Sequence, residues 1–149
     1  MTAPDLSLSA YFTQHHREAD SFWAEVENAV VDKDPARVSG AFSRFDRSIR
    51  KHFLLEEEVL FPEFEKVTGS SQGPTMVMMA EHLRVRALLD QMQTALDAVD
   101  HDSLMDVGDT LMTFVQQHNM KEEAMLYRMC EQMLGGQWEA LYERLRSYL

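Results

Sequence analysis

The chain has 149 residues, of which 45% are hydrophobic and 26% charged, a composition typical of one globular domain and not of a disordered segment. Its formal net charge of −11 argues against nucleic acid and anionic membrane as partners, because both attract basic surfaces. The apolar runs are too short to span a membrane, and the N-terminus lacks the features of a signal peptide. A single cysteine excludes an internal disulfide, so we expect a cytoplasmic, reducing location.

Apolar residues at helical spacing predict a first helix over residues 6–31 and a second over about 35–66. Asp34 is the expected N-cap of the second helix, because its carboxylate can accept a hydrogen bond from the first turn. Pro62 lies inside this helix and is expected to kink it or fray its last turn, and Gly69 ends it.

A linker over residues 70–75 precedes a third predicted helix at 75–99 and a fourth at 103–134. A short amphipathic segment at 138–149 closes the chain. No segment alternates with a period of two residues, so the prediction is an all-α fold. Four long helices with short connections indicate an up-down-up-down four-helix bundle with a short C-terminal helix.

Two phrases repeat along the chain: HFLLEEEVLF at 52–61 and HNMKEEAMLY at 118–127. A shift of 66 positions superimposes them and also aligns an isolated upstream histidine in each half. The aligned pairs are His16 with His82, His52 with His118, Glu56 with Glu122, Glu57 with Glu123, and Phe61 with Tyr127. The repeat predicts one domain made of two helical hairpins, about 4–69 and 70–135, followed by a C-terminal helix at 136–149.

The repeated His-x-x-x-Glu spacing places each pair on one face of its helix, because residues four apart lie one turn apart. Diagonal packing of the helices would therefore gather four imidazoles and two carboxylates in the core. Burying six such groups without a partner would cost several kcal/mol apiece, so this core needs an ion. Mixed nitrogen and oxygen donors suit iron, and also zinc or manganese, better than magnesium or calcium.

The segments HHREAD, HFLLEEEVLFPEFE, EHLRVR and HNMKEEAMLY resemble those of the hemerythrin-like (HHE cation-binding) domains, over nearly the whole chain. The resemblance implies a four-helix bundle around a non-haem di-iron centre, bridged by carboxylates and an oxo or hydroxo group, with zinc or manganese as substitutes for the two iron ions. Carried over by motif, the implied metal ligands are His16, His52, Glu56, His82, His118 and Glu122.

Two adjacent histidines compete for the first ligand position, and they cannot both face the metal because neighbouring residues point about 100° apart on a helix. The repeat aligns His16 with His82, which favours His16 as the ligand. His15 is then expected at the boundary of the core or as a partner of a ligand.

The chain departs from the oxygen-carrying hemerythrins at Arg86, where those proteins have a further histidine. Arginine stays protonated and does not bind iron, so one metal has an open position or takes another ligand. Asp20 is the aligned residue in the first half, which predicts either an Arg86–Asp20 salt bridge or a cation beside a bound small ligand. The alternative is that Arg86 reaches the end of the bundle and pairs with any acid there.

Three glutamates adjoin the implied ligands: Glu57, Glu81 and Glu123. They are candidate partners or additional ligands, although a charged helix face is the expected explanation for at least two of them. Tyr127 is a candidate redox-active or hydrogen-bonding phenol, with packing beneath the site as the default expectation.

Several other residues are expected to have structural roles. His101 is expected in an exposed turn, and Cys130 as a small buried hydrophobe. The methionines Met76, Met78 and Met79 are expected to fill the core; lining a tunnel for small molecules is the less favoured reading.

Three functions fit the resemblance. The favoured one is a binding module for dioxygen or nitric oxide, because the sequence contains no other catalytic constellation. The second is a di-iron oxidoreductase acting on peroxide or nitric oxide or repairing damaged iron centres, and the third is iron storage or delivery. The expected partner is thus a small diatomic or peroxide ligand, and the sequence leaves monomer and homodimer open.

Overall fold

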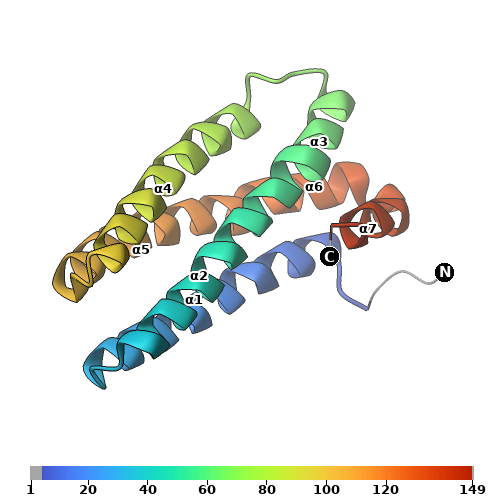
Figure 1. Ribbon diagram of the computed structural model, residues 1–149. Coiled ribbons are helices and arrows are strands. Elements are labelled where there is room, and N and C mark those ends of the chain that lie inside the picture. Colours follow the sequence, from blue (N-terminus) through green and yellow to red (C-terminus); the bar gives the residue numbers. More distant parts are fainter. Residues whose placement is uncertain (1–4, 149) are drawn as a thin grey trace.

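The computed structural model describes residues 5–148, and within that range the chain forms helices and no strands. Four helical rods run up, down, up and down, with a last short helix across one end (Figure 1). The rods are α1 (Leu8–Val31), α2–η1–α3 (Pro35–Leu55, Glu56–Leu60, Phe61–Thr68), α4 (Pro74–Asp97) and α5–η2–α6 (His101–Lys121, Glu122–Leu126, Tyr127–Leu134), followed by η3 (Gly135–Gln137) and α7 (Trp138–Arg146). The predicted all-α four-helix bundle is confirmed.

The rods begin and end at residues with the expected capping chemistry. Asp34 accepts a hydrogen bond from the Arg37 backbone N–H at 3.2 Å, as predicted, and Asp100 caps α5 in the same way. Gly69 ends α3 in the left-handed region, at a φ of 73°. His101 is the first residue of α5 and is half-buried, so the expectation of an exposed turn is wrong. The helix begins at His101 because Asp100 is its N-cap.

The second and fourth rods each contain a π-helical turn, η1 and η2, in which backbone hydrogen bonds span five residues instead of four. The π-helical turn η1 therefore lies before Pro62 in the chain. The predicted fraying at Pro62 is wrong, because α3 continues past it to Thr68. Proline is not the cause of the π turn, since η2 is followed by Arg128 at the equivalent position. Both π turns start at a glutamate of the repeated motif, which connects them with the site.

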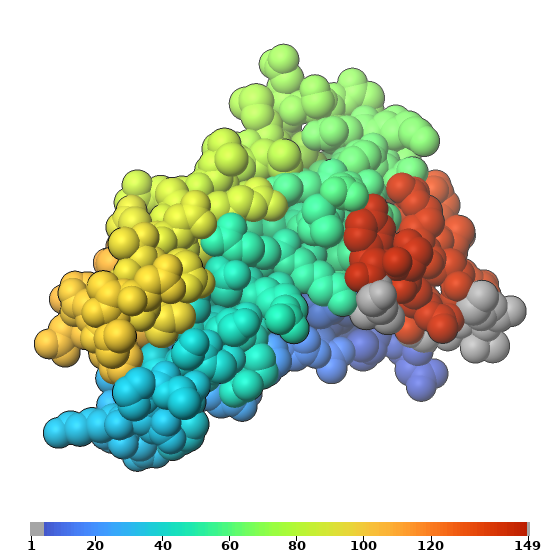
Figure 2. Space-filling model, in the orientation of Figure 1, coloured from blue at the N-terminus to red at the C-terminus, as the bar shows by residue number. Residues whose placement is uncertain are grey.

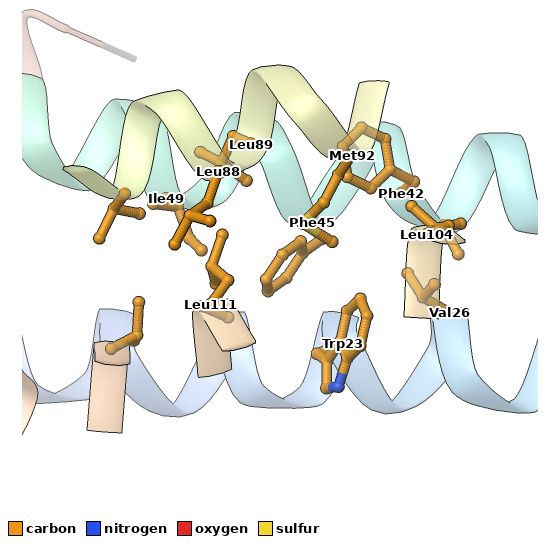
Figure 3. Close-up of a cluster of buried hydrophobic side chains, with 14 of the residues drawn as sticks. Trp23, Val26, Phe42, Phe45, Ile49, Leu88, Leu89, Met92, Leu104 and Leu111 are labelled. Carbon is orange, nitrogen blue, oxygen red and sulfur yellow. The ribbon is translucent and has the colours of Figure 1, made fainter. Parts of the chain in front are cut away.

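One apolar cluster fills the half of the bundle toward the α1–α2 and α4–α5 connections, and Figure 3 shows its side chains pointing toward one another. Trp23, Phe45 and Leu111 are among its buried side chains. Gly108 faces this tryptophan so closely that an added Cβ would lie 2.1 Å from Trp23 Cη2. Close approach of α5 to α1 at this point therefore requires glycine.

A second apolar cluster lies at the other end, where α7 covers the bundle (Figure 2). Cys130 is fully buried there, as expected, and burial raises the pKa of its thiol to about 12. Met78 also belongs to this cluster, but Met76 and Met79 are 53% and 41% exposed. The expectation of core filling is thus right only for Met78, because the other two lie on the outer face of α4. In residues 5–148 no helix is both long and apolar enough to cross a membrane.

Candidate metal centre

A layer of ionisable side chains separates the two apolar clusters. It contains two glutamates and four histidines, each at most 6% exposed. They are His16 on α1, His52 on α2, Glu56 in η1, His82 on α4, His118 on α5 and Glu122 in η2. The structure therefore brings together all six residues predicted from the sequence, one or two from each rod.

The six side chains form two overlapping groups whose donor atoms lie within 4.8 Å of one another. One group contains Glu56, His82, His118 and Glu122, and the other contains His16, His52 and Glu122. Because Glu122 belongs to both groups, the arrangement could hold two neighbouring cations with a shared carboxylate.

The donor atoms have the properties that a cation site requires. Four buried atoms have no hydrogen-bond partner in the described part of the chain: Glu56 Oε1, His82 Nε2, His118 Nε2 and Glu122 Oε2. His82 Nε2 lies 3.2 Å from Glu56 Oε1, and His118 Nε2 lies 3.2 Å from Glu122 Oε1. These atoms converge without forming hydrogen bonds, and a cation placed among them would offset the cost of burying polar atoms unpaired, about 1–3 kcal/mol each. Imidazole nitrogens mixed with carboxylate oxygens fit a transition metal such as iron, zinc or manganese.

Three of the four histidines are oriented by a second glutamate at their outer nitrogen. The contacts are His16 Nδ1 to Glu123 at 2.7 Å, His82 Nδ1 to Glu57 at 2.6 Å, and His118 Nδ1 to Glu81 at 2.8 Å. A proton held at Nδ1 by a carboxylate leaves Nε2 free for the centre. The expectation that at least two of these glutamates belong to charged helix faces is therefore wrong, because helix packing turns all three toward the histidines of neighbouring helices.

The outer nitrogen of His52 instead contacts a neutral imidazole, with His15 Nδ1 at 3.1 Å from His52 Nδ1. Burial, together with the positive charges of His52 and His16 and of the nearby Lys51, lowers the pKa of His15 to about 3. His15 thus contacts a member of the cluster without belonging to it, as the repeat alignment indicated.

Tyr127 lies inside the cluster rather than beneath it. Its phenol oxygen is 2.6 Å from Glu56 Oε2 and 3.0 Å from Glu122 Oε1, and the side chain is fully buried. The same oxygen is 3.2 Å from Nε2 of both His16 and His52. The default expectation of packing beneath the site is therefore wrong for this ring.

The π turn explains why regular helix spacing does not predict the position of Tyr127. Tyr127 follows Glu122 by five residues, a spacing that would direct the two side chains apart on a regular α-helix. In η2 the Tyr127 backbone N–H bonds to the Glu122 carbonyl, and the wider turn brings the two side chains together. Phe61 occupies the equivalent place after η1 and packs its ring 5.8 Å from that of His82.

Arg86 forms a bidentate salt bridge with Glu57, with both nitrogen–oxygen distances at 2.8 Å. Its guanidinium also lies over the Phe53 ring, 5.4 Å from the centroid. Asp20 accepts a hydrogen bond from Gln116 at 3.1 Å, so the predicted Arg86–Asp20 bridge is wrong. α1 and α4 are diagonal in the bundle, and η1 supplies a nearer carboxylate to Arg86. The alternative of an acidic partner is correct, but that acid adjoins the site instead of the bundle end.

The charges within the cluster favour ionised forms. Burial alone would lower the pKa of His52, but the carboxylates of Glu56 and Glu122 raise it to about 10. Burial alone would raise the pKa of Glu122, but hydrogen bonding with Glu56 and with the surrounding imidazoles holds it well below its usual range. Burial and the two carboxylates raise the pKa of Tyr127 well above its usual range. A cation entering the cluster would replace protons on the imidazoles, so its binding depends on pH.

A groove of about 520 Å³ lies between α1, α2 and α7, and His15 and His52 are among its lining residues. Its walls include the basic side chains of Arg47 and Lys51. A much smaller cavity, about 20 Å³, adjoins His16 and His52 on the side of Asn119. Space for small molecules is thus found beside the half of the cluster contributed by α1 and α2.

Comparison with known proteins identifies the family to which the chain belongs. The model of the hemerythrin HHE cation binding domain matches residues 7–130. A protein described as a DNA nickase from Nostoc sp. (strain PCC 7120) is 22% identical over an alignment of 149 positions, which covers 96% of this chain and 40% of that protein. The chain therefore spans well under half of that relative, and no solved structure matches it. Because the family model covers most of the sequence, the chain belongs to the hemerythrin HHE cation-binding family.

Proposed function

We propose that the protein is a non-haem di-iron protein that binds or senses dioxygen or nitric oxide. The observation that supports this most directly is the pair of overlapping donor groups sharing Glu122, with four buried donor atoms that have no hydrogen bond. In this proposal His16 and His52 hold one iron and His82 and His118 the other. Glu56 would add a carboxylate oxygen to the second position, and Glu122, which belongs to both donor groups, would be available to either.

Iron bound in this cluster would supply a redox-active Lewis acid that can take up a small ligand. Neighbouring side chains orient the histidines and shield them from water. Glu57, Glu81 and Glu123 keep their histidines in a fixed orientation, which strengthens ligation. Phe53 stacks on His82 with centroids 3.8 Å apart and excludes water from that side, so the electrostatic attraction to a cation is stronger there.

The enzymatic alternative is a di-iron oxidoreductase acting on peroxide or nitric oxide. The groove lined in part by His15 and His52 favours it, because a turnover site needs a path by which substrate enters and product leaves. DNA nicking belongs to the Nostoc relative as a whole, and we do not extend it to this chain, whose net charge is −11. Iron storage or delivery is the remaining alternative, and a cytoplasmic location and a homodimer remain predictions.

Anaerobic loading with ferrous iron, metal analysis and optical titration with dioxygen and nitric oxide test the proposal. We expect two irons per chain and a reversible spectral change with at least one gas. His82→Ala should lose iron, whereas His101→Ala, outside the cluster, should keep it. A chain that binds zinc but no iron would contradict the di-iron proposal. Irreversible oxidation with continuous peroxide consumption would favour the oxidoreductase.

A further inference from the structure

The structure assigns a seventh donor to the centre: we propose that Tyr127 is a metal ligand in the half formed by His16 and His52. This inference rests on the proposed metal binding and specifies it further. It gives the two metal positions different ligand sets, with a phenolate oxygen at one and none at the other.

The contacts of the phenol oxygen carry the argument. It lies within 3.2 Å of four donor atoms that belong to the cluster, two imidazole nitrogens and two carboxylate oxygens. A phenol has one proton to donate, so it can satisfy only one of these contacts as a hydrogen-bond donor. An oxygen placed among atoms that all favour a cation is positioned to bind the same cation.

The surroundings keep Tyr127 in this place. Its side chain has no solvent exposure, and its ring packs against Phe12 at 5.5 Å and stacks on His16 at 5.7 Å between centroids. The backbone is fixed by the π turn, through the hydrogen bond from its N–H to the Glu122 carbonyl. The phenol therefore cannot turn toward solvent without opening the core.

The aligned residue in the other half provides an internal comparison. Phe61 occupies the equivalent place after η1 and offers no donor atom. Arg86, which stands where a further imidazole would be expected, lies in that same half and is held by Glu57. One half thus contains a phenolic oxygen beside its donors, and the other contains a phenyl ring in the equivalent place.

Ligation is a proton exchange without a redox step. The phenol O–H bond breaks, an oxygen–metal bond forms, the proton leaves to solvent, and the oxidation state of the metal is unchanged. A coordinated cation favours the deprotonated form of a ligand, as it does for a thiol.

The test is spectroscopic, on the full chain loaded with ferric iron. We expect a visible phenolate-to-iron charge-transfer band and resonance Raman modes of a coordinated tyrosinate. Ring-deuterated tyrosine incorporated into the wild-type protein should shift those modes. Tyr127→Phe should lose the band while retaining iron, and Tyr142→Phe, a phenol on α7 outside the cluster, should keep it.

The outcomes separate this inference from the proposed function. A wild-type protein that binds two irons without a tyrosinate signal overturns the ligand assignment and leaves the di-iron proposal intact. A wild-type protein that binds no iron overturns both. A band that persists in Tyr127→Phe assigns the signal to another phenol and also overturns the inference. The isotope shift in the wild type decides the presence of tyrosinate even if the variant does not fold.

Discussion

The two halves of the centre share a sequence pattern but differ in what surrounds it. In the half of His16 and His52 the neighbours are Tyr127, the neutral imidazole of His15 and Glu123. In the half of His82 and His118 the equivalent neighbours are Phe61, Glu81 and Glu57. The repeated residues thus place the donors symmetrically, while the neighbours that differ make the two halves chemically distinct.

Charge compensation differs in the same way. Arg86 pairs with Glu57, and Lys121 pairs with Glu81, so each outer carboxylate of the second half has its own cation. Among residues 5–148 no lysine or arginine forms an ion pair with Glu123, whose side chain is 37% exposed. The outer carboxylates of the second half are thus charge-compensated and 15–16% exposed, whereas Glu123 in the first half is more open to solvent.

Removing the carboxylate that both halves share should have the largest effect. Glu122→Ala deletes a donor from both groups, so we expect iron to fall from two per chain to nearly none. The thermal midpoint of unfolding in the presence of iron should fall with it, because metal binding is coupled to folding. Metal analysis and a melting curve measure both quantities. Glu27→Ala, on the exposed face of α1, is the control, and retention of two irons by Glu122→Ala would refute the shared role.

Replacing a single histidine, in one half or in the other, should distinguish the two metal positions. We expect His82→Ala and His16→Ala each to lose about one iron, since each deletes a nitrogen donor from a single group. Only His82→Ala should keep the tyrosinate signal, because the phenol belongs to the other half. Metal analysis combined with resonance Raman spectroscopy checks this. Equal loss of the signal in both variants would show that the halves are not independent.

Breaking the charge compensation of the second half should have an intermediate effect. Burial alone would raise the pKa of Glu57, but hydrogen bonds from His82 and Arg86 lower it to about 2. Because this pKa is depressed in the folded state, the stabilisation is complete above the ordinary carboxyl pKa of 4.5 and is lost as pH falls toward 2. Arg86→Ala should therefore lower the free energy of unfolding of the metal-free protein by about 1–3 kcal/mol at neutral pH.

Denaturant titrations from neutral to acidic pH measure this effect. The difference between the wild type and Arg86→Ala should shrink as pH falls below the ordinary carboxyl pKa. Iron affinity should decrease roughly tenfold, since His82 loses part of its support. Arg84→Ala, an exposed arginine on the same helix, is the matched control. A pH-independent difference would show that Arg86 contributes through packing on Phe53 instead.

The aligned substitution in the first half should have the smallest effect. Burial and the charge of Glu123 raise the pKa of Asp20, while the hydrogen bond from Gln116 opposes that shift. Asp20→Asn removes the repulsion and keeps a hydrogen-bonding side chain, so stability should change by within about 0.5 kcal/mol. Iron content and the unfolding midpoint should match those of the wild type. A large loss of iron would mean that Asp20 supports the centre in the way that Arg86 does.

The sequence by itself determined the helices, their order and the six donors that meet in the core. Caps such as Asp34 and the four-residue spacing from His52 to Glu56 are local features, because a regular helix relates residue number directly to position and direction. The shift that aligns His16 with His82 then extended this local geometry to the second hairpin.

Only the tertiary structure decided the neighbours of those donors. Tyr127 enters the cluster because a π turn changes its direction, and a repeated sequence phrase does not reveal such a turn. Glu81 and Glu123 reach histidines on other helices, and Arg86 finds Glu57 instead of Asp20. These contacts depend on the rotation and separation of packed helices, which sequence spacing along one helix does not determine.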